Sequence, residues 1–451
     1  MAYTAPTLSA MVDDLARSLG DSGKVFWLQD ELERLCREAL RTWNCYASYW
    51  RNRRQFNTVA NNHYYNLSTL NLVSVVADQG PLLNDLQYAL VEPFSAVPPF
   101  DSFTTTAQYT AAQINSAVLQ ALKQFQFDAG IVLTAEPAVP LPITPDYQAE
   151  LNENVADVRH VAAEYIAPGD PLDGAIIHLR RHNEFDIQYF DTTSLMDAGW
   201  PYGYSLIFPS SQPTLRIIPQ SSMLGELDIV SIRSDSFPPI DWQWPAKWLA
   251  LHYLLTMDGQ SRDHARAQYC KKRYEDALSL AAITPSYAVG YINGRPVPIV
   301  PASDMDNDDP GWRMRFLAAG EEPNTLVSYG WNLIGVHPTP SAAAPLFSIS
   351  FDMFVEAPVS TDPIQIAPEH LQAVLDYAKH IAIFKLGGAE FATTEPLMER
   401  FFMEAMEYNS RLKAESRQFH TMRDRANRDK QMYARRAQVT SSENVLAGEG
   451  S

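Results

Sequence analysis

The chain contains one succession of patterns twice, and this duplication constrains its fold more than any other feature. Each copy has an alternating strand led by an aromatic residue, a second alternating strand, a proline that starts a helix, a glycine break and another helix. The copies cover residues 204–280 and 331–408. Their leading strands are 331 − 204 = 127 residues apart, and the helix-starting prolines, Pro245 and Pro368, are 368 − 245 = 123 apart. These offsets are too long for a solenoid repeat and predict a duplication on the scale of a domain.

Helical periodicity marks three parts of the chain outside the second copy. Apolar residues recur there at intervals of three and four, as on the buried face of a helix. The three parts are residues 7–50, 108–128 and 245–283. In the first part, the stripe of aliphatic and aromatic side chains from Leu28 to Trp50 must pack against another layer, so we expect it in a core.

Strand-like patterns fill the intervals between these helices. Residues 54–100 and 131–240 alternate in polarity and are rich in proline, which favours antiparallel sheets. Asn61 and Asn62 supply turn chemistry for a hairpin within residues 55–67. The predicted fold class is therefore α+β, in which a helical bundle or helical hairpins combine with antiparallel, sandwich-like sheets and the whole is internally duplicated.

The patterns divide the chain into four expected parts. Residues 1–284 form a first domain that contains all three helical stretches and both strand-rich stretches. Residues 285–324 are rich in proline, glycine and aspartate, so we expect an extended arm or linker. Residues 325–410 hold the second strand pair and helical hairpin, and residues 411–451 form a basic helix followed by a flexible tail.

Composition limits the classes of function. The 451 residues carry a net charge of −18, which argues against a protein that grips nucleic acid, because phosphate contacts need clustered Lys and Arg. An acidic channel would instead let DNA slide past by repelling it. No apolar run reaches membrane-spanning length and the first residues lack a signal-peptide pattern, so we expect synthesis in the cytoplasm and no membrane partner. Cys36, Cys45 and Cys270 are expected to be buried, reduced thiols.

Motifs of known catalytic chemistry are missing from the sequence. It holds no glycine-rich phosphate loop, no GxSxG elbow and no HExxH motif. Asp263 and His264 are adjacent, but neighbours on a helix do not face each other, so they are poor candidates for a base and its orienting group. We therefore predict no catalytic residues and no cofactor.

Two patterns imitate metal sites. His178 and His182 have the spacing of ligands on a helix, but they lie in a strand-like stretch, where this spacing separates them by about 13 Å. Asp304, Asp306 and Asp308 imitate the opening of a calcium loop, yet the glycine and glutamate of its sixth and twelfth positions are missing. We therefore predict no metal site in either stretch.

The strongest local charge lies between Arg411 and Arg436. Nine basic residues oppose three acidic ones there, which gives 9 − 3 = +6 within an acidic chain. Few apolar residues occupy helical spacing, so the segment cannot fold on its own core, and we expect it to order on a partner; a solvated helix end is the alternative. The basic residues are Arg411, Lys413, Arg417, Arg423, Arg425, Arg428, Lys430, Arg435 and Arg436.

The order of these parts resembles the head-to-tail adaptor, or neck connector, proteins of tailed bacteriophages. An early helix, a strand pair and a closing helical hairpin carry the resemblance. These passages are residues 27–43, 213–229 and 244–274. Residues after Ile283 depart from the smaller adaptors, and the second repeat looks like an added copy.

The resemblance implies a structural virion protein at the head-tail junction. Its copies would form a ring, commonly twelvefold, between the portal protein and a tail tube or nozzle protein, and viral DNA would pass through the lumen without sequence-specific binding. Family members often dock through a C-terminal extension, a role that falls here on the basic residues between Arg411 and Arg436, which would pair with portal carboxylates. Residues 285–324 would reach a neighbouring subunit or the tail.

Two other functions fit parts of the sequence. A tail or baseplate β-sandwich protein that binds carbohydrate or another tail component would use exposed aromatic residues. Trp200, Tyr202 and Tyr204 form such a cluster, although their place at the start of a strand favours a core or an interface. A hydrolase with paired acids would leave no trace in sequence spacing. We expect a structural protein and not an enzyme.

Overall fold

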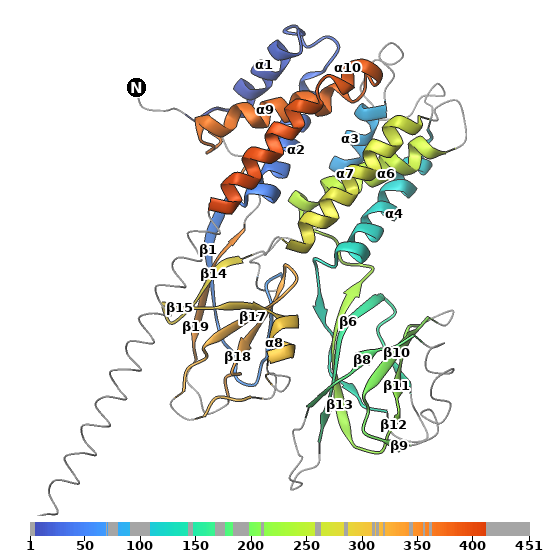
Figure 1. Cartoon of the computed structure of the whole chain (residues 1–451), viewed down its shortest axis with the longest axis vertical. Coiled ribbons are helices and arrows are strands. Elements are labelled where there is room, and N and C mark those ends of the chain that lie inside the picture. Colours follow the sequence, from blue (N-terminus) through green and yellow to red (C-terminus); the bar gives the residue numbers. More distant parts are fainter. Residues whose placement is uncertain are drawn as a thin grey trace, which may run out of the picture.

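The protein has a helical layer at one end and two β bodies that lie beside each other at the other end, as the computed structural model shows (Figure 1). Helices and largely antiparallel sheets both contribute, which confirms the predicted α+β class. The structure describes residues 5–411 except 69, 71–79, 91–108, 143–147, 167–175, 184–197, 209–211, 258–262, 284–286, 309–311, 313–314, 319–320, 342–345, 355–356 and 360–362.

Most of the helices belong to the layer at the top of Figure 1. The helical elements are α1 (Leu8–Ser18), α2 (Gln29–Ala47), α3 (Gly80–Leu90), α4 (Ala111–Ala129), the 3-10 turn η1 (Ile240–Trp242), α6 (Trp244–Thr256), α7 (His264–Ile283), α8 (Ala302–Asp308), α9 (Pro368–Ile383) and α10 (Gly388–Ala392). A further helix spans residues 395–411 and is called the closing helix below.

The strands divide between the two β bodies. One body contains β3 (Thr134–Ala135), β4 (Val139–Pro140), β5 (Gln148–Glu150), β6 (Val155–Tyr165), β7 (Ile176–His178), β8 (Arg180–Arg181), β9 (Ala198–Gly199), β10 (Gly203–Ile207), β11 (Thr214–Ile218), β12 (Gln220–Ser221) and β13 (Gly225–Arg233). The other contains β1 (Arg51–Asn57), β2 (Tyr64–Asn66), β14 (Tyr287–Ile292), β15 (Arg295–Val297), β16 (Ile299–Pro301), β17 (Thr325–Tyr329), β18 (Leu333–His337) and β19 (Ser348–Phe354).

The two β bodies have the same strand order. One sheet of the first body is β5-β11-β10-β8, and its counterpart is β2-β18-β17-β16; in both, only the last pair is parallel. The second sheets, β3-β13-β6-β7 and β1-β19-β14-β15, are antiparallel throughout. The predicted duplication is therefore visible strand by strand.

One copy is inserted into the other. Residues 111–283, from α4 to α7, form a continuous copy that we call the inserted unit. Residues 8–67 and 287–411 together form the second copy, the split unit. Within each, the early helix packs on the helix that follows the last strand, α4 on α6 and α2 on α9. The predicted division at residue 284 differs from this arrangement because β1 and β2 pair with strands that come after it.

The alignment of the two copies also differs from the prediction by one strand. The strand after Trp331 was matched with the strand at Tyr204, but β18 has the position of β11, and β17 has the position of β10. Trp331 lies in the turn between β17 and β18, and its backbone N–H donates to Ile131 at 2.6 Å. Both hairpins alternate in polarity, so the pattern alone does not fix which strand is which.

The main core lies in the helical layer and is shared by the two units. It includes buried side chains from α1, α2 and α9 of the split unit and from α4, α6 and α7 of the inserted unit. Trp43 of α2 and Trp248 of α6 are fully buried in it, and Tyr377 stacks on Phe401 with ring centroids 4.4 Å apart. The stripe between Leu28 and Trp50 is confirmed as core.

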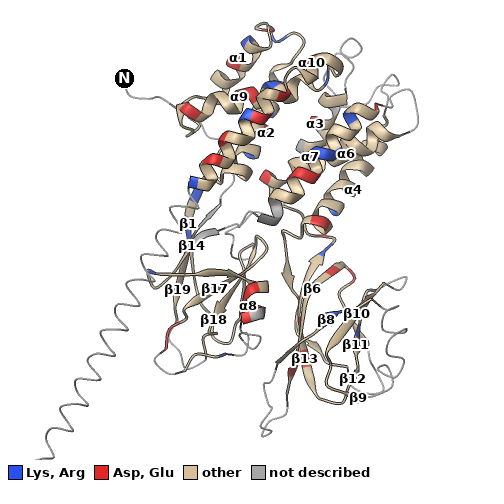
Figure 2. Cartoon of the chain, in the orientation of Figure 1, with Lys and Arg blue, Asp and Glu red and all other residues tan. Residues whose placement is uncertain are grey.

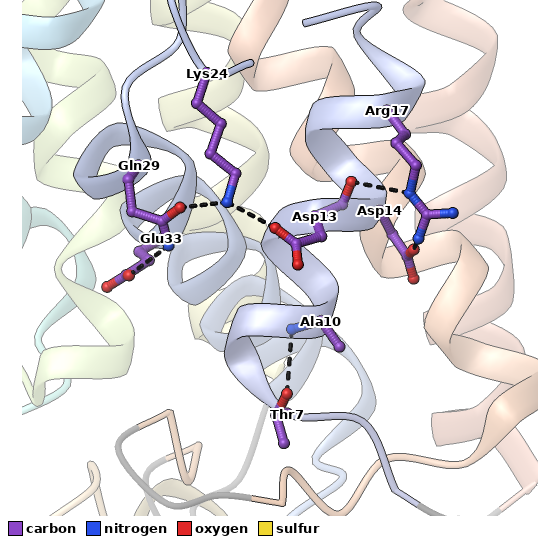
Figure 3. Close-up of polar contacts among 8 residues, drawn as sticks. All are labelled: Thr7, Ala10, Asp13, Asp14, Arg17, Lys24, Gln29 and Glu33. Atoms are coloured by element: carbon purple, nitrogen blue, oxygen red, sulfur yellow. Dashed lines mark hydrogen bonds and ion pairs between the residues drawn. The ribbon is translucent and has the colours of Figure 1, made fainter. Parts of the chain in front are cut away.

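Local hydrogen bonds fix the entry of the chain into this layer (Figure 3). The hydroxyl of Thr7 accepts from the N–H of Ala10 at 3.1 Å and caps α1. Between α1 and α2, the ammonium group of Lys24 lies 2.6 Å from Asp13 and also donates to Gln29. α1 is therefore tied to the start of α2 as well as packed against it.

The prediction of a hairpin within residues 55–67 was wrong. β1 pairs with β19 and β2 pairs with β18, so the two neighbouring strands belong to different sheets. The turn around Asn61 exists, and Asn61 has a positive φ of 58°, but its backbone N–H donates to Pro340. Long-range pairing with the second half of the chain has replaced the local pairing.

Residues 285–324 are not an extended arm in their described part. β14 pairs with β19 and β15, β16 pairs with β17, and Trp312 is fully buried. Pro296 and Pro301, which suggested a linker, stand in β15 and β16, the edge strands of their sheets. A missing backbone N–H breaks no ladder hydrogen bond on the outer side of an edge strand, so these prolines are compatible with the sheets.

Candidate functional site

The predicted partner-binding segment begins at the last residue that the structure describes. Arg411 is the last described residue of the closing helix, is exposed and pairs with Glu407 one turn earlier. Charges of both signs mark this helix in Figure 2, and Arg400 lies 2.9 Å from Glu404. The remaining basic residues of the segment lie outside the described residues; they are Lys413, Arg417, Arg423, Arg425, Arg428, Lys430, Arg435 and Arg436.

The aromatic cluster proposed for carbohydrate binding is divided between core and surface. Tyr204 is buried in the sandwich of the inserted unit, where its hydroxyl is 3.4 Å from the carbonyl of Val158. Trp200 and Tyr202 are 45% and 46% exposed. The expected core role is thus confirmed for Tyr204. The other two rings are partly exposed and have different neighbours, since Trp200 packs on Tyr165 and Tyr202 packs on His182.

Charged side chains are buried where the helices of the two units meet. Lys247 of α6 donates to Glu38 of α2, and both side chains are almost fully enclosed. Burial alone would lower the pKa of Lys247, but the charges of Glu38 and Asp85 outweigh it and raise the pKa. Burial also raises the pKa of Asp85. A cavity of about 150 Å³ adjoins the pair and is lined by Arg34, Arg37, Glu38, Arg41, Leu82, Asp85, Gln243, Trp244 and Lys247.

The cations around this cavity already have acidic partners. The pairs are Arg34 with Asp30 at 2.9 Å and with Asp85 at 3.7 Å, Arg37 with Glu33 at 3.5 Å, and Arg41 with Asp241 at 3.6 Å. Such a balanced set has little excess positive charge to offer an anionic ligand. We interpret it as a polar seam that fixes the two units against each other.

Two further contacts cross the same seam between α7 and α9. Arg273 donates to the hydroxyl of Tyr377 at 3.0 Å, and Tyr269 lies 2.7 Å from Nε2 of His380. Nδ1 of His380 is 2.8 Å from the hydroxyl of Thr394. Burial, followed by the charge of Arg273, lowers the pKa of His380 to about 3, so this imidazole is neutral at physiological pH.

A separate polar cluster lies between the two β bodies. His160 of β6, His178 of β7 and Asp306 of α8 each contribute one atom able to bind a metal, and these atoms all lie within 4.8 Å of one another. Nδ1 of His160 is 3.5 Å from Oδ2 of Asp306, and the two histidine rings have centroids 5.2 Å apart. The cluster joins a sheet of the inserted unit to a helix of the split unit.

The cluster takes one residue from each of the two patterns that imitated metal sites. His182 is not part of it; its ring packs on Tyr202 with centroids 5.9 Å apart. The acidic run is the helix α8 and not a calcium loop, and Asp304 and Asp308 are exposed. His160 was not predicted as a metal ligand, because a single histidine in an apolar strand does not indicate which residues will face it.

The other sequence candidates have structural roles. Asp263 accepts from the backbone N–H of Arg266 at 3.0 Å and so caps α7. The three cysteines are free and buried, as predicted. Burial raises the pKa of Cys36 to about 12, so this thiol is unreactive at neutral pH.

A scan against protein-family models and a search of the curated proteins both gave no match to this chain. Within the part of the chain that the structure describes, no helix has both the length and the apolar character needed to cross a membrane.

Proposed function

We propose that this protein is a structural virion component of a tailed bacteriophage, a ring-forming head-to-tail adaptor that links the portal to the tail. In this role it binds the portal protein on one side and a tail tube or nozzle protein on the other. Viral DNA passes through the ring during ejection without sequence-specific contacts, and the chain is not an enzyme.

The observation that carries this proposal is the side-by-side arrangement of two like units. Both units have their helices at one end and their β body at the other, so they lie side by side and point the same way (Figure 1). When it is repeated, a contact of this kind between different faces of two similar units generates a closed ring if its rotation closes, and an open helical filament if it does not. One chain therefore already contains a lateral contact of the type that a ring repeats.

The passages that resemble the phage adaptors support the same reading. The early helix at residues 27–43 covers most of α2, the strand passage at 213–229 covers β11 and part of β13, and the hairpin at 244–274 covers α6 and part of α7. Each of these elements has a counterpart in the other unit, so each unit holds the complete set of helix, strand pair and closing hairpin.

The duplication offers two ways to build a ring of twelve units. Twelve chains form the ring that the resemblance implies, whereas six chains would supply twelve units if both units of each chain line it. With a chain of 50.6 kDa, these assemblies have masses of 12 × 50.6 = 607 and 6 × 50.6 = 304 kDa. We propose twelve chains, and mass photometry of the purified assembly distinguishes the two.

Electron microscopy of the purified protein, alone and mixed with the portal of the same phage, tests the adaptor role. We expect rings with a central channel that cap the portal. A monomer that leaves the portal bare at micromolar concentration would overturn the proposal.

A truncation separates the role of the basic segment from that of the folded units. A chain that ends at Tyr408 lacks all nine basic residues, and we expect it to lose most of its portal binding. A chain that ends at Thr440 keeps all nine and should bind fully. Because exposed charges are screened by salt, binding of the full chain should also weaken as ionic strength rises. Undiminished binding by the shorter chain would remove this segment from the interface.

The partial exposure of Trp200 and Tyr202 is compatible with the alternative function, carbohydrate binding. A glycan array probed with the full chain and with Trp200→Ala tests it. Glycan binding that depends on Trp200 would favour a tail or baseplate protein over the adaptor.

A further inference from the structure

Two histidines share one face of a sheet in the inserted unit. β6 and β7 are antiparallel, and Ala162 of β6 stands opposite His178 of β7. His160 is two residues before Ala162, so its side chain leaves the strand on the same face and is a diagonal neighbour of His178. The strand register therefore brings the two imidazoles together.

Asp306 approaches this pair from the split unit. Its helix, α8, follows β16 and packs beside β17. Its Oδ1 accepts the indole N–H of Trp312 at 2.8 Å, and its Oδ2 lies 3.5 Å from His160. Trp312 is fully buried, so this hydrogen bond holds the carboxylate with one oxygen toward the histidine. Metal-binding side chains are commonly oriented by such outer hydrogen bonds.

Apolar packing fixes the distance between the two sides of the cluster. Val230 and Ile232 of β13 belong to one buried cluster with Trp312 and Val327 of the split unit. Tyr64 of β2 adds a hydrogen bond of 2.7 Å to Asp228 of β13. The two histidines and Asp306 are thus held near one another by contacts that their own side chains do not make.

We propose that His160, His178 and Asp306 bind one zinc ion, or a similar divalent transition metal, and that this ion joins the inserted unit to the split unit.

The donor set decides which metals fit. Two imidazole nitrogens and one carboxylate oxygen suit zinc and its neighbours, whereas Ca²⁺ and Mg²⁺ prefer oxygen ligands alone. A tetrahedral ion with bonds of about 2.0 to 2.1 Å holds its ligand atoms about 3.3 Å apart. The separation of 3.5 Å between His160 and Asp306 is close to this value, and the limit of 4.8 Å for the whole set leaves only side-chain rotations to complete it. Three protein ligands leave the fourth position to water.

The ion would act as a clamp on the folded arrangement. Its ligands come from both units, so it binds tightly only while the two β bodies are docked, and binding to the folded state alone raises stability. This inference does not depend on the adaptor role, because it concerns contacts within one chain.

Zinc titration of the full chain tests the site. The protein is freed of metal by a chelator, the chelator is dialysed away, and ZnCl₂ is added in a calorimeter while the thermal midpoint is followed in parallel. We expect one zinc ion per chain with micromolar or tighter affinity, and a midpoint that rises with zinc concentration. A dissociation constant weaker than about 1 mM would overturn the proposal, since it exceeds what even weak extracellular metal modules show.

Three variants assign the ligands. His178→Ala and Asp306→Asn should weaken zinc binding at least about 100-fold, because loss of a mere orienting partner already costs about 10- to 100-fold. Asp306→Asn keeps an oxygen that can accept the Trp312 N–H, so its fold should be retained, and circular dichroism checks this. His182→Ala removes a nearby histidine outside the cluster and should bind zinc as the parent does. Equal affinity in all three variants would overturn the proposal.

Other ions test the class of metal. Co²⁺ should produce the visible absorption bands of a four-coordinate site in the parent and not in Asp306→Asn. A midpoint that rises with Ca²⁺ and not with Zn²⁺ or Co²⁺ would overturn the assignment to a transition metal.

Discussion

At the scale of single residues, Lys247 is the most direct probe of the seam between the units. Its ammonium group is enclosed beside Glu38, and the charge of Asp85 also acts on it. Lys247→Met leaves buried carboxylates without their cation, so we expect the free energy of unfolding to fall by about 3 to 5 kcal/mol. Urea denaturation followed by tryptophan fluorescence measures the change.

An exposed lysine provides the matched control. Lys271 of α7 is 59% exposed and lies 3.8 Å from Glu275. Pairs of this kind contribute little, so Lys271→Met should change stability by less than about 1 kcal/mol. The double variant Glu38→Met with Lys247→Met should recover part of the loss, since it removes both charges. If both variants lost a similar amount of unfolding free energy, the buried charges between the two units would not stabilise the fold.

His380 makes stability depend on pH in a defined direction. Its pKa is about 3 in the folded protein against an ordinary value of 6.5, so the unfolded chain takes up the proton first as pH falls. Its contribution to stability is complete above pH 6.5 and is lost progressively from there down to about pH 3.

Comparison with a variant isolates this single group. Between pH 7 and pH 4, the thermal midpoint of His380→Gln should fall less than that of the parent, because all other titrating groups are common to both. A fall of equal size in the two proteins would show that His380 does not carry the effect.

Sequence reasoning was reliable for residues whose roles follow from their own neighbours. The stripe ending at Trp50 and the buried cysteines needed only the local pattern of the sequence. The cluster of His160, His178 and Asp306 was beyond it, because its members come from two units and meet only through strand register and domain docking.

At the scale of elements, the start of α4 can be tested by removing its cap. The hydroxyl of Thr110 accepts from the N–H of Gln113 at 3.2 Å, and the amide of Gln113 accepts from the N–H of Thr110 at 2.8 Å. Thr110→Ala should lower the free energy of unfolding by about 1 kcal/mol, as measured by denaturation. Gln124→Ala, an exposed change later in α4, should cost less than about 0.5 kcal/mol. A loss no larger than that of Gln124→Ala would show that the cap is not needed.

Individual elements were predicted far better than their pairing. The helices at residues 108–128 and 245–283 were recovered as α4 and as α6 with α7. The hairpin at 55–67 failed because turn chemistry describes only local preference, whereas β1 and β2 gain more by completing two sheets that the end of the chain supplies. The proline-rich stretch at 285–324 failed because edge strands tolerate proline.

At the scale of the whole molecule, the sequence revealed the duplication but not its nesting. Apolar periodicity repeats in both units, so a linear comparison detects the strands and helices that close each one. The early helix and first strands of the split unit lie before the inserted unit, more than 200 residues from their partners. No local pattern records such a separation, which the structure shows through the pairing of β1 with β19 and of β2 with β18 and through the packing of α2 on α9.

The shared helical core predicts that the two units unfold together. Phe401 of the closing helix is fully buried, contacts Trp43 and stacks on Tyr377, within a core that continues into α6 and α7 of the inserted unit. Phe401→Ala should cost about 3 to 5 kcal/mol by leaving a cavity. If both units share this core, the amides of β13 and of β19 exchange only when the whole protein unfolds. In the variant, amide hydrogen exchange should then accelerate equally in β13 of the inserted unit and in β19 of the split unit, by roughly 100-fold or more. Mass-spectrometric exchange of the two strands in parent and variant measures this. Acceleration confined to β19 would mean that the inserted unit is stable on its own and that the helical layer is only a contact between two independent domains.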